Sequence, residues 1–359
     1  MTPLAEKLAA QIRNGGPMTV ADFMAACLAD PQHGYYMRGE PFGRAGDFIT
    51  APEISQIFGE LIGLWAVGVW EMMGSPEAFV LAELGPGRGT LMSDMLRTAR
   101  VKPAFLKAAN VHLVEMSPQL REVQKKTLAS SDHAIHWNLR LDDIPKGPAI
   151  FIANEFFDAL PIRQFQWKDG NWGERVIGLD REDKFAFGLA PVQQRPASVA
   201  LPDGAIVEAS PTGIAVMTII AERLAEQGGA ALIIDYGSDK PGIGDTLQAV
   251  RQHKYESPFA TPGQADVTAH VDFAALGRTA ENAGAEARTV MPQGELLVRL
   301  GIVERANVLG RGKDAKTRDA IASAIERLAG QKQMGTLFKA LAVSSPGLKL
   351  PVFDPLSEE

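Results

Sequence analysis

Four short apolar runs between residues 78 and 154 constrain the fold more than any other feature of this sequence. They are AFVLAEL (78–84), NVHLVE (110–115), AIHW (134–137) and AIFIAN (149–154). The first two runs are each followed by a segment in which apolar residues recur at helical spacing. Strands that alternate with helices predict a parallel sheet covered on both faces, which is the doubly wound α/β class.

A different pattern follows between about residues 160 and 205. Apolar and polar residues alternate in IRQFQWKDGNWGERVIGLDREDKFAFGLAP, with KDGN and DRED as turn signals, which predicts a small antiparallel β insertion. The α/β pattern resumes with a helix near 211–227 and the strand AALIIDYG. Residues 294 to about 335 are again helical in pattern, and LFKALAVSS permits either a last strand or a continuing helix.

The segment AELGPGRGT joins the first predicted strand to its helix. Gly85, Gly87 and Gly89 follow the strand directly, which lets a ligand approach the main chain and the N-terminus of the helix. Their spacing differs from the dinucleotide fingerprint G-x-G-x-x-G, and the G-K-[ST] of a phosphate-binding loop is absent. Glu83 would repel a pyrophosphate, so the segment predicts a cationic, amino-acid-like ligand.

Acidic residues also follow the next two strands. Glu115 ends the second run, where a carboxylate can accept hydrogen bonds from both ribose hydroxyls of a nucleoside. Asp142, in RLDDIP after the third run, suits an adenine amino group, although a solvated loop acid is the alternative. Ribose recognition alone does not distinguish NAD from S-adenosylmethionine (SAM). Together with Glu83, acids at three successive strand ends predict a SAM pocket.

The fourth run ends in ANEFFDALP, and its polar residues are the predicted catalytic group. Asn154, Glu155 and Asp158 offer an amide oxygen and two carboxylates at the sheet edge where the reactive group of a cofactor meets its substrate. Such a set could hold a cationic nitrogen nucleophile in line with a methyl sulfonium and accept its proton late. The alternative is that Asn154 and Asp158 cap the following turn.

The composition argues against several other functions. A net charge of −7 and the lack of a Lys/Arg run disfavour a nucleic-acid partner. The single cysteine, Cys27, lies in an apolar helical pattern, which predicts a buried thiol and a reducing compartment. Only ten uncharged residues separate Glu60 from Glu71, so we expect a buried helix there and no membrane insertion. His133 and His136 lack further ligands nearby, so no metal site is expected.

With these residues in view, the sequence resembles the MidA-like family of class I SAM-dependent methyltransferases, which includes a mitochondrial assembly factor of respiratory complex I. The resemblance implies a seven-stranded, mostly parallel Rossmann-like sheet with SAM as the cofactor. By its motifs, Gly85, Gly87, Gly89 and Glu115 bind SAM, and Asn154 and Glu155 lie beside the transferred methyl group. The matching segments are GDFITAPEISQIFGELIG, ELGPGRGTLM, VEMSPQLREVQ, ANEFFDALPIRQF, IIDYG, GQADVTAHVDF and QMGTLFKAL.

The expected organisation is an N-terminal helical extension over residues 1–75 and a methyltransferase domain over 76–359. The domain carries the β insertion at about 160–205 and a helical insertion at about 294–335. The segment GDFITAPEIS is expected to fold over the cofactor, and a structural loop on the long helix is the alternative. Its predicted cofactor contacts are Asp47, Phe48 and Thr50. In DVTAHVDF, Thr268 could begin a helix as its N-cap, and His270 could equally lie at the substrate mouth.

The resemblance implies symmetric dimethylation of an arginine on a complex I subunit during assembly, with a protein as the partner. The N-terminus lacks transit-peptide character, so a bacterial-type cytoplasmic protein is expected. The apolar N-terminal helices allow a homodimer interface, and burial within one chain explains them as well. A non-catalytic SAM-binding assembly factor or chaperone is the alternative, for which the fold alone suffices. A nicotinamide-dependent oxidoreductase is disfavoured by the glycine spacing.

Overall fold

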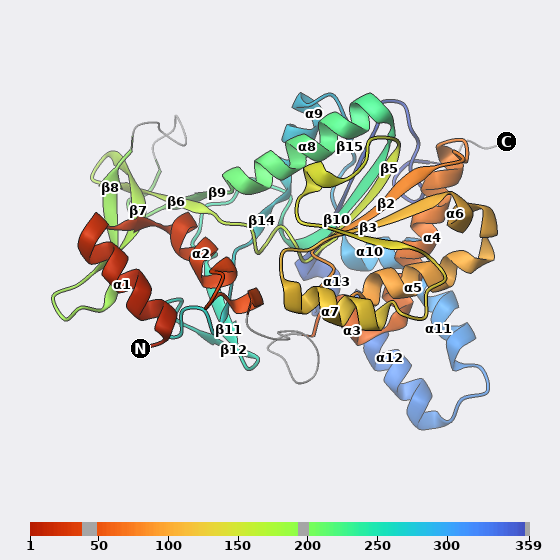
Figure 1. Ribbon diagram of the computed structural model, residues 1–359, viewed down its shortest axis with the longest axis horizontal. Coiled ribbons are helices and arrows are strands. Elements are labelled where there is room, and N and C mark those ends of the chain that lie inside the picture. Colours follow the sequence, from red (N-terminus) through yellow and green to blue (C-terminus); the bar gives the residue numbers. More distant parts are fainter. Residues whose placement is uncertain (38–48, 193–200, 356–359) are drawn as a thin grey trace. The chain divides into compact units, whose positions relative to one another are not determined.

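The computed structural model describes residues 1–37, 49–192 and 201–355 of the chain. They form two compact units, each built from segments that are distant in sequence (Figure 1). We call the first the N-terminal unit; it comprises Met1–Phe48, Asp158–Ala215 and Lys240–Asp272. We call the second the sheet unit; it comprises Ile49–Phe157, Val216–Asp239 and Phe273–Glu359.

Seven strands of the sheet unit lie side by side in the order β15-β17-β10-β5-β2-β3-β4, and an eighth, β16, pairs with β17 outside this order. The five strands β10, β5, β2, β3 and β4 pair in parallel, each with its neighbour in this order. Strand β17 pairs antiparallel with both β10 and β15. This arrangement confirms the predicted doubly wound, mostly parallel Rossmann-like fold. The strands are β2 (Phe79–Leu84), β3 (Ala109–Val114), β4 (Ile135–Asn138), β5 (Ala149–Asn154), β10 (Gly229–Ser238), β15 (Glu286–Ala287), β16 (Met291–Pro292) and β17 (Phe338–Ser344).

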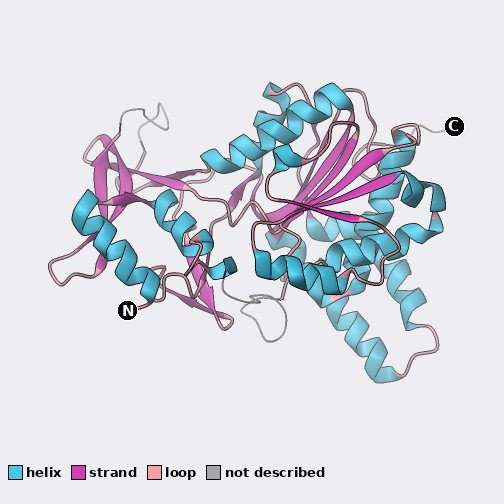
Figure 2. Ribbon diagram, in the orientation of Figure 1, coloured by secondary structure: helices cyan, strands magenta, loops and turns pink. Residues whose placement is uncertain are grey.

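Helices cover both faces of this sheet, and Figure 2 shows the strands in magenta between them. In Figure 1, α8 and α9 lie on one face, and α4 and α5 lie on the other. The longer helices are α4 (Gln56–Met72), α5 (Thr90–Thr98), α7 (Pro118–Thr127), α8 (Pro211–Gln227), α9 (Phe273–Asn282), α11 (Ile302–Gly310) and α12 (Ala315–Ala329). The shorter ones are α3 (Ala51–Ile54), η2 (Ala99–Val101), α6 (Pro103–Ala108), η3 (Leu141–Asp143), α10 (Gln293–Arg299) and α13 (Met334–Leu337).

The sequence LFKALAVSS forms a strand and not a continuing helix. The short helix α13 ends at Leu337, and β17 begins at Phe338 between β10 and β15. Six of its seven residues are buried, since it is covered on both faces. Helical spacing and a short apolar run cannot be told apart over so few residues, which is why the sequence left both options open.

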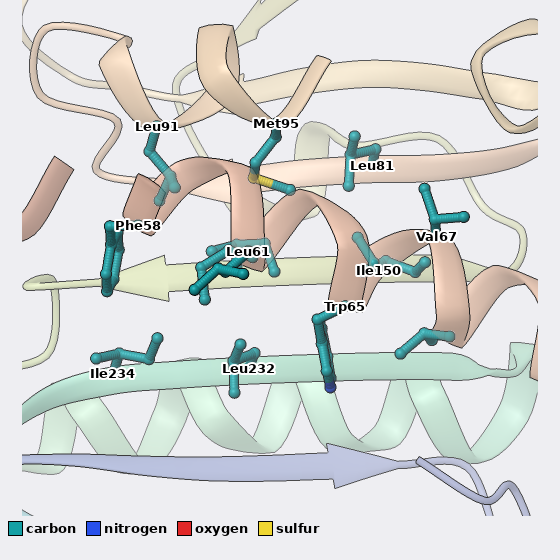
Figure 3. Packing of buried hydrophobic residues seen from close by; sticks show 14 of the residues in the cluster. Phe58, Leu61, Trp65, Val67, Leu81, Leu91, Met95, Ile150, Leu232 and Ile234 are labelled. Atoms are coloured by element: carbon teal, nitrogen blue, oxygen red, sulfur yellow. The ribbon is translucent and has the colours of Figure 1, made fainter. Parts of the chain in front are cut away.

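Central strands β2 and β5 are buried along their whole length, as expected from their mostly apolar sequences. Helix α4 packs across them, and Figure 3 shows its Phe58, Leu61 and Trp65 among side chains from the sheet and from α5. A Cβ atom on Gly63 would lie 2.8 Å from the Met95 Cα atom, so glycine is needed for α5 to approach α4 this closely. Among the described residues, no helix is long and apolar enough to cross a bilayer.

Glu60, in the middle of α4, joins the helical insertion to the core of the sheet unit. Its side chain is 3% exposed. Its Oε2 atom accepts a hydrogen bond from Arg305 Nε at 2.6 Å, and its Oε1 atom accepts from Arg97 Nη2 at 3.0 Å. Arg305 belongs to α11 and Arg97 to α5, so one buried carboxylate holds three helices together.

The N-terminal unit contains two small antiparallel sheets and a helical layer. Its first sheet has the order β1-β7-β6-β9, with β8 paired to β7, which confirms the predicted antiparallel β insertion. Its second sheet has the order β12-β11-β13. The elements are α1 (Pro3–Gly15), β1 (Met18–Thr19), α2 (Val20–Ala29), η1 (Tyr35–Met37), β6 (Arg163–Lys168), β7 (Asn171–Leu179), β8 (Phe185–Pro191), β9 (Ile206–Ala209), β11 (Gln248–Arg251), β12 (Lys254–Glu256), β13 (Asp266–Thr268) and β14 (Val271–Asp272).

These compact units divide the chain differently from the segments expected from sequence. Helices α3 and α4 lie within residues 1–75 but belong to the sheet unit, because α4 covers the sheet. Helices α1 and α2 instead share a core with the β insertion and with residues near Val267, and this core buries Cys27 as predicted. Thr268 lies in β13 and does not cap a helix, because α9 begins at Phe273.

Replacement of Glu60 by glutamine should destabilise the sheet unit. The variant leaves Arg305 without this carboxylate, whereas Arg97 keeps its ion pair with Asp94 at 2.6 Å. Because both arginines are partly exposed, we expect a loss of about 2 kcal/mol in the free energy of unfolding. Urea denaturation measures this loss. Glu71→Gln is the matched control on the same helix, since Glu71 pairs with Lys102 at 2.6 Å with both side chains about half exposed. It should cost less than about 1 kcal/mol. Equal losses of stability in the two variants would contradict the conclusion that Glu60 holds the three helices together.

Candidate active site

Parallel pairing brings several predicted residues to one edge of the sheet. Strand β2 lies between β3 and β5, so Glu83 is opposite Leu113 on one side and Ile152 on the other. The chain runs from β2 to β3 and β4 on one side and then crosses back to β5 on the other, which makes the carboxyl end of β2 a topological switch point. Ligands of doubly wound proteins bind at such a point. Glu115 follows β3, and Asn154 ends β5, at the same edge.

The glycine loop leaves β2 in a conformation that favours glycine. Gly85, Gly87 and Gly89 have φ angles of +60°, +53° and +81°. The Gly85 N–H donates to the Val114 carbonyl at 3.1 Å, and the Gly89 N–H donates to the Pro86 carbonyl at 2.7 Å. A Cβ atom at Gly85 would lie 2.9 Å from a ring carbon of Phe156. The loop is therefore fixed by close packing as well as by its backbone angles.

Glu83 is a buried acid just before this loop. Only 3% of the residue is exposed, and its Oε2 atom has no hydrogen-bond partner among the described residues. Burial raises the pKa of this carboxyl from its usual 4.5 to about 8; the neighbouring Glu115 charge adds to the rise, and a hydrogen bond from the Met92 backbone opposes it. A buried carboxyl with an unsatisfied oxygen fits a ligand that carries a positive charge.

Glu115 is held by two hydrogen bonds at the end of β3. Its Oε1 atom accepts from the Ser117 N–H at 2.8 Å, and its Oε2 atom accepts from Gln124 Nε2 at 3.0 Å. Burial raises the pKa of Glu115, and these two hydrogen bonds oppose the rise. The Ser117 side chain also caps α7, so the start of this helix and the carboxylate are fixed together. Sequence analysis did not identify Gln124, although it closes the motif VEMSPQLREVQ.

Asn154 and Glu155 lie at the end of β5. Glu155 has a φ angle of +51°, which is uncommon for a residue other than glycine and is frequently found at functional sites. Its Oε1 atom accepts from the Ala51 N–H and from Asn154 Nδ2, both at 3.1 Å. The turn is held by Asp235 in β10, whose Oδ2 atom accepts from the backbone N–H groups of Phe156 and Phe157. Sequence analysis matched IIDYG to the family without assigning a role to this aspartate.

The segment before α4 contacts two parts of the site. Thr50 is the N-cap residue of α3, without a hydrogen bond from its side chain to the helix. The next residue, Ala51, contacts Glu155, and the Glu53 carboxylate accepts a hydrogen bond from the hydroxyl of Thr90 at the start of α5. Sequence analysis did not identify Glu53. The predicted cofactor contacts Asp47 and Phe48 lie outside the described residues.

The other two predicted acids, Asp142 and Asp158, have environments that differ from each other. Asp142 lies in η3 after β4, with 57% of its side chain exposed and its carboxylate 3.8 Å from Arg140. This is the environment of a solvated loop acid, and its adenine contact stays a prediction. Asp158 is buried in the N-terminal unit, where its carbonyl accepts from the Ala269 N–H at 3.0 Å. Its catalytic role also stays a prediction, and so does the placement of His270.

A glycine loop after the first strand of a doubly wound sheet, with buried acids before it and after the next strand, defines the class of SAM-dependent methyltransferases. Residues 61–291, more than half of the chain, match the family described as "Putative S-adenosyl-L-methionine-dependent methyltransferase". The chain belongs to this family. It is a SAM-dependent methyltransferase, and SAM is its cofactor.

Relatives and a solved structure resemble almost the whole chain. The chain is 40% identical to the mitochondrial protein arginine methyltransferase NDUFAF7 homolog of Drosophila melanogaster, over 95% of this chain and 84% of the relative. It is 37% identical to human mitochondrial protein arginine methyltransferase NDUFAF7, over 96% of this chain and 83% of the relative. A crystal structure from Burkholderia thailandensis, bound to S-adenosyl-homocysteine, has a TM-score of 0.86 and 27% identity, and the match covers 96% of this chain and 92% of that one.

These relatives correct one expectation. The cytoplasmic location expected from the N-terminal sequence is wrong, since both of these relatives are named as mitochondrial proteins. The expectation depended on the lack of a recognisable targeting segment in this sequence. Such a lack is weak grounds for a location.

Glu83→Gln should remove a pH dependence of stability. The folded chain binds the Glu83 proton more tightly than the unfolded chain does, so its free energy of unfolding should fall as the pH rises from about 5 to about 8. Relative to the variant, this fall should amount to a few kcal/mol, because each tenfold difference in proton affinity corresponds to about 1.4 kcal/mol. Urea denaturation without SAM at several pH values measures it. Glu77→Gln, at an exposed position just before β2, is the control and should follow the wild type. Parallel pH profiles of the wild type and Glu83→Gln would refute this role of Glu83.

Gly85→Ala should weaken SAM binding much more than it weakens folding. Alanine at a positive φ costs about 1 kcal/mol, and its methyl group would also push the loop away from Phe156. The matched control is Gly74→Ala, since Gly74 has a φ of +81° with nothing within 4 Å of a Cβ atom. We expect similar losses of stability in urea, but a SAM affinity lowered more than tenfold by calorimetry only for Gly85→Ala. Equal affinities in the two variants would show that the geometry of the loop does not control binding.

Proposed function

We propose that this methyltransferase methylates arginine residues of a protein. The observation that carries the proposal is that the chain aligns over 95% of its length, at 40% identity, with a relative named a protein arginine methyltransferase. A second relative at 37% identity carries the same activity in its name. An alignment of this extent includes the strand ends at which we predict the catalytic residues.

The chemistry of the sheet edge is compatible with this activity. Bound SAM supplies an electrophilic methyl group on a positively charged sulfur. Glu83, Glu115 and the glycine loop are the residues that we propose hold it: the buried Glu83 carboxyl would meet its cationic amino-acid portion, and Glu115 would accept hydrogen bonds from its ribose hydroxyls. Gly85, Gly87 and Gly89 would allow the main chain to approach it closely.

Glu155 is the residue that we propose orients the arginine and takes its proton. A guanidinium is charged at neutral pH, so the attacking nitrogen must lose a proton as the new N–C bond forms. A carboxylate at the end of β5 can accept hydrogen bonds from the guanidinium, hold one nitrogen toward the methyl group and accept that proton. Asn154 Nδ2 and the Ala51 N–H would hold this carboxylate in place through hydrogen bonds to its Oε1 atom. Asp158 is proposed as a further acid for the same substrate.

The substrate that we propose is an arginine on a subunit of respiratory complex I, dimethylated symmetrically during assembly of the complex. This follows from the resemblance of seven sequence segments to the MidA-like family. The net charge of −7 also favours a basic segment of a partner protein over an acidic one.

Glu155→Gln should separate binding of SAM from catalysis. The amide keeps the size of the side chain and an oxygen that can accept from Ala51, so SAM affinity should stay within about threefold of the wild type. Methyl transfer should fall by about 100-fold or more, because the proton acceptor is lost. Calorimetry gives the affinity, and transfer of a labelled methyl group from SAM to purified complex I subunits gives the rate. Amino-acid analysis of the product then identifies symmetric dimethylarginine. Glu122→Gln, at an exposed position on α7, is the control.

The same variant tests the non-catalytic alternative. Cells that carry only Glu155→Gln should accumulate complex I subunits without methylarginine and should assemble less of the complex. Normal assembly without methylation would instead favour a role as a SAM-binding assembly factor. Methylation at the wild-type rate by the variant would contradict the assignment of Glu155.

A further inference from the structure

Gln124 is a fully buried side chain on α7 that contacts three other parts of the sheet unit. Its Nε2 atom donates to the Gly87 carbonyl at 2.8 Å and to Glu115 Oε2 at 3.0 Å. Its Oε1 atom accepts from Trp137 Nε1, in β4, at 2.9 Å. The residue is 0% exposed, so these contacts are shielded from water. One amide thus joins the glycine loop, the acid after β3 and the neighbouring strand.

The chemistry of the three partners fixes the orientation of this amide. An indole N–H can only donate, so the atom that faces Trp137 must be the oxygen. The Gly87 carbonyl and the Glu115 carboxylate accept hydrogen bonds, so both must face the NH₂ group. That group has two hydrogen atoms and here has two acceptors. A flipped amide would place its oxygen against two acceptors and its NH₂ group against a donor, and it is excluded.

Packing and hydrogen bonding at Gln124 together fix the distance between the glycine loop and α7. A Cβ atom on Gly89 would lie 3.4 Å from Gln124 Cγ and 3.5 Å from Gln124 Cα. Helix α7 is therefore in close contact with the end of the loop as well as hydrogen-bonded to its middle. Because the amide is neutral, it holds the Glu115 carboxylate without cancelling its negative charge. An arginine or a lysine in its place would neutralise that charge.

We propose that Gln124 is a positioning residue for the cofactor site, which fixes the Glu115 carboxylate and the Gly87 carbonyl relative to each other and thereby sets the affinity for the SAM nucleoside. The inference depends on the predicted role of Glu115 as the ribose acceptor and not on the identity of the methyl acceptor. Gln124 itself is not a ligand. Without it, the carboxylate would have to be ordered by the ribose, and that ordering would cost binding free energy.

Gln124→Leu tests the proposal because it should change KM and leave kcat nearly unchanged. The variant removes all three hydrogen bonds, so we expect the Kd for S-adenosyl-homocysteine and the KM for SAM to rise about tenfold or more. The kcat at saturating SAM should stay within about threefold, because the groups at the end of β5 are unchanged. A general structural defect would lower kcat through loss of folded protein, which urea denaturation and circular dichroism detect. Wild-type affinity in a folded Gln124→Leu variant would overturn the proposal.

The Gln124→Glu variant keeps the shape of the side chain and should make the affinity for the cofactor depend on pH. When the new carboxyl is protonated it can donate to Glu115 but not also to the Gly87 carbonyl, so affinity for S-adenosyl-homocysteine near pH 6 should lie only modestly below that of the wild type. As it ionises, two carboxylates face each other, and affinity should fall about tenfold or more by pH 8.5 relative to the wild type at each pH. Gln119→Glu, at an exposed position on the same helix, is the matched control and should show the wild-type profile. Coincident profiles of Gln124→Glu and Gln119→Glu would overturn the proposal.

A double-mutant cycle with Glu115→Gln tests whether Gln124 acts through Glu115. If it does, the losses of affinity from Gln124→Leu and Glu115→Gln should be clearly less than multiplicative in the double variant. Multiplicative losses, or an unchanged affinity in Glu115→Gln alone, would overturn the inference. Because S-adenosyl-homocysteine binding needs no methyl acceptor, these measurements keep their meaning even if the acceptor is not an arginine. Failure of the proposed function and failure of this inference are therefore distinguishable.

Discussion

The site depends on the parallel pairing of β2 with β3 on one side and with β5 on the other. Only this pairing brings the residues that follow three separate strands to one edge of the sheet. The core keeps the pairing in register, since β2 and β5 are buried along their whole length beneath α4. A shift of one strand by a single residue would reverse which side chains face each layer of helices, so the packing of α4 also fixes the positions of the acids.

The structure holds several unfavourable features at this edge. One oxygen of the buried Glu83 carboxyl has no hydrogen-bond partner in the described part of the chain, and Glu155 has a left-handed backbone. Glu83 lies near the end of β2 and Glu155 directly follows β5, and the hydrophobic cluster around these strands supplies the stability that offsets their cost. Asp235 contributes as well, since its carboxylate binds two consecutive N–H groups directly after Glu155 and so stabilises the strained turn.

The sequence was sufficient to predict most of the sheet and the positions of the glycine loop, Glu115 and Asn154. These are local features, because an apolar run, the turn after it and the next residue can be recognised without knowing the order of the strands in the sheet. The units were harder to predict, because helical spacing shows that α1, α2 and α4 have apolar faces but not what those faces cover. Gln124, Glu53 and Asp235 were missed for a related reason. Each acts through a partner distant in sequence, and nothing local distinguishes a bridging glutamine from one on the surface, such as Gln119.

The donors that hold the acids differ between the core and the site, and this difference has a chemical consequence. Glu60, which joins three helices, is bound by two arginines that neutralise it. The hydrogen bonds described for the carboxylate of Glu115 come instead from the Ser117 backbone N–H and from the Gln124 amide. Neutral donors fix the direction of a carboxylate and leave its negative charge available to a ligand. SAM carries a sulfonium and an ammonium group, so an acid that is ordered by neutral donors is suited to a positively charged cofactor.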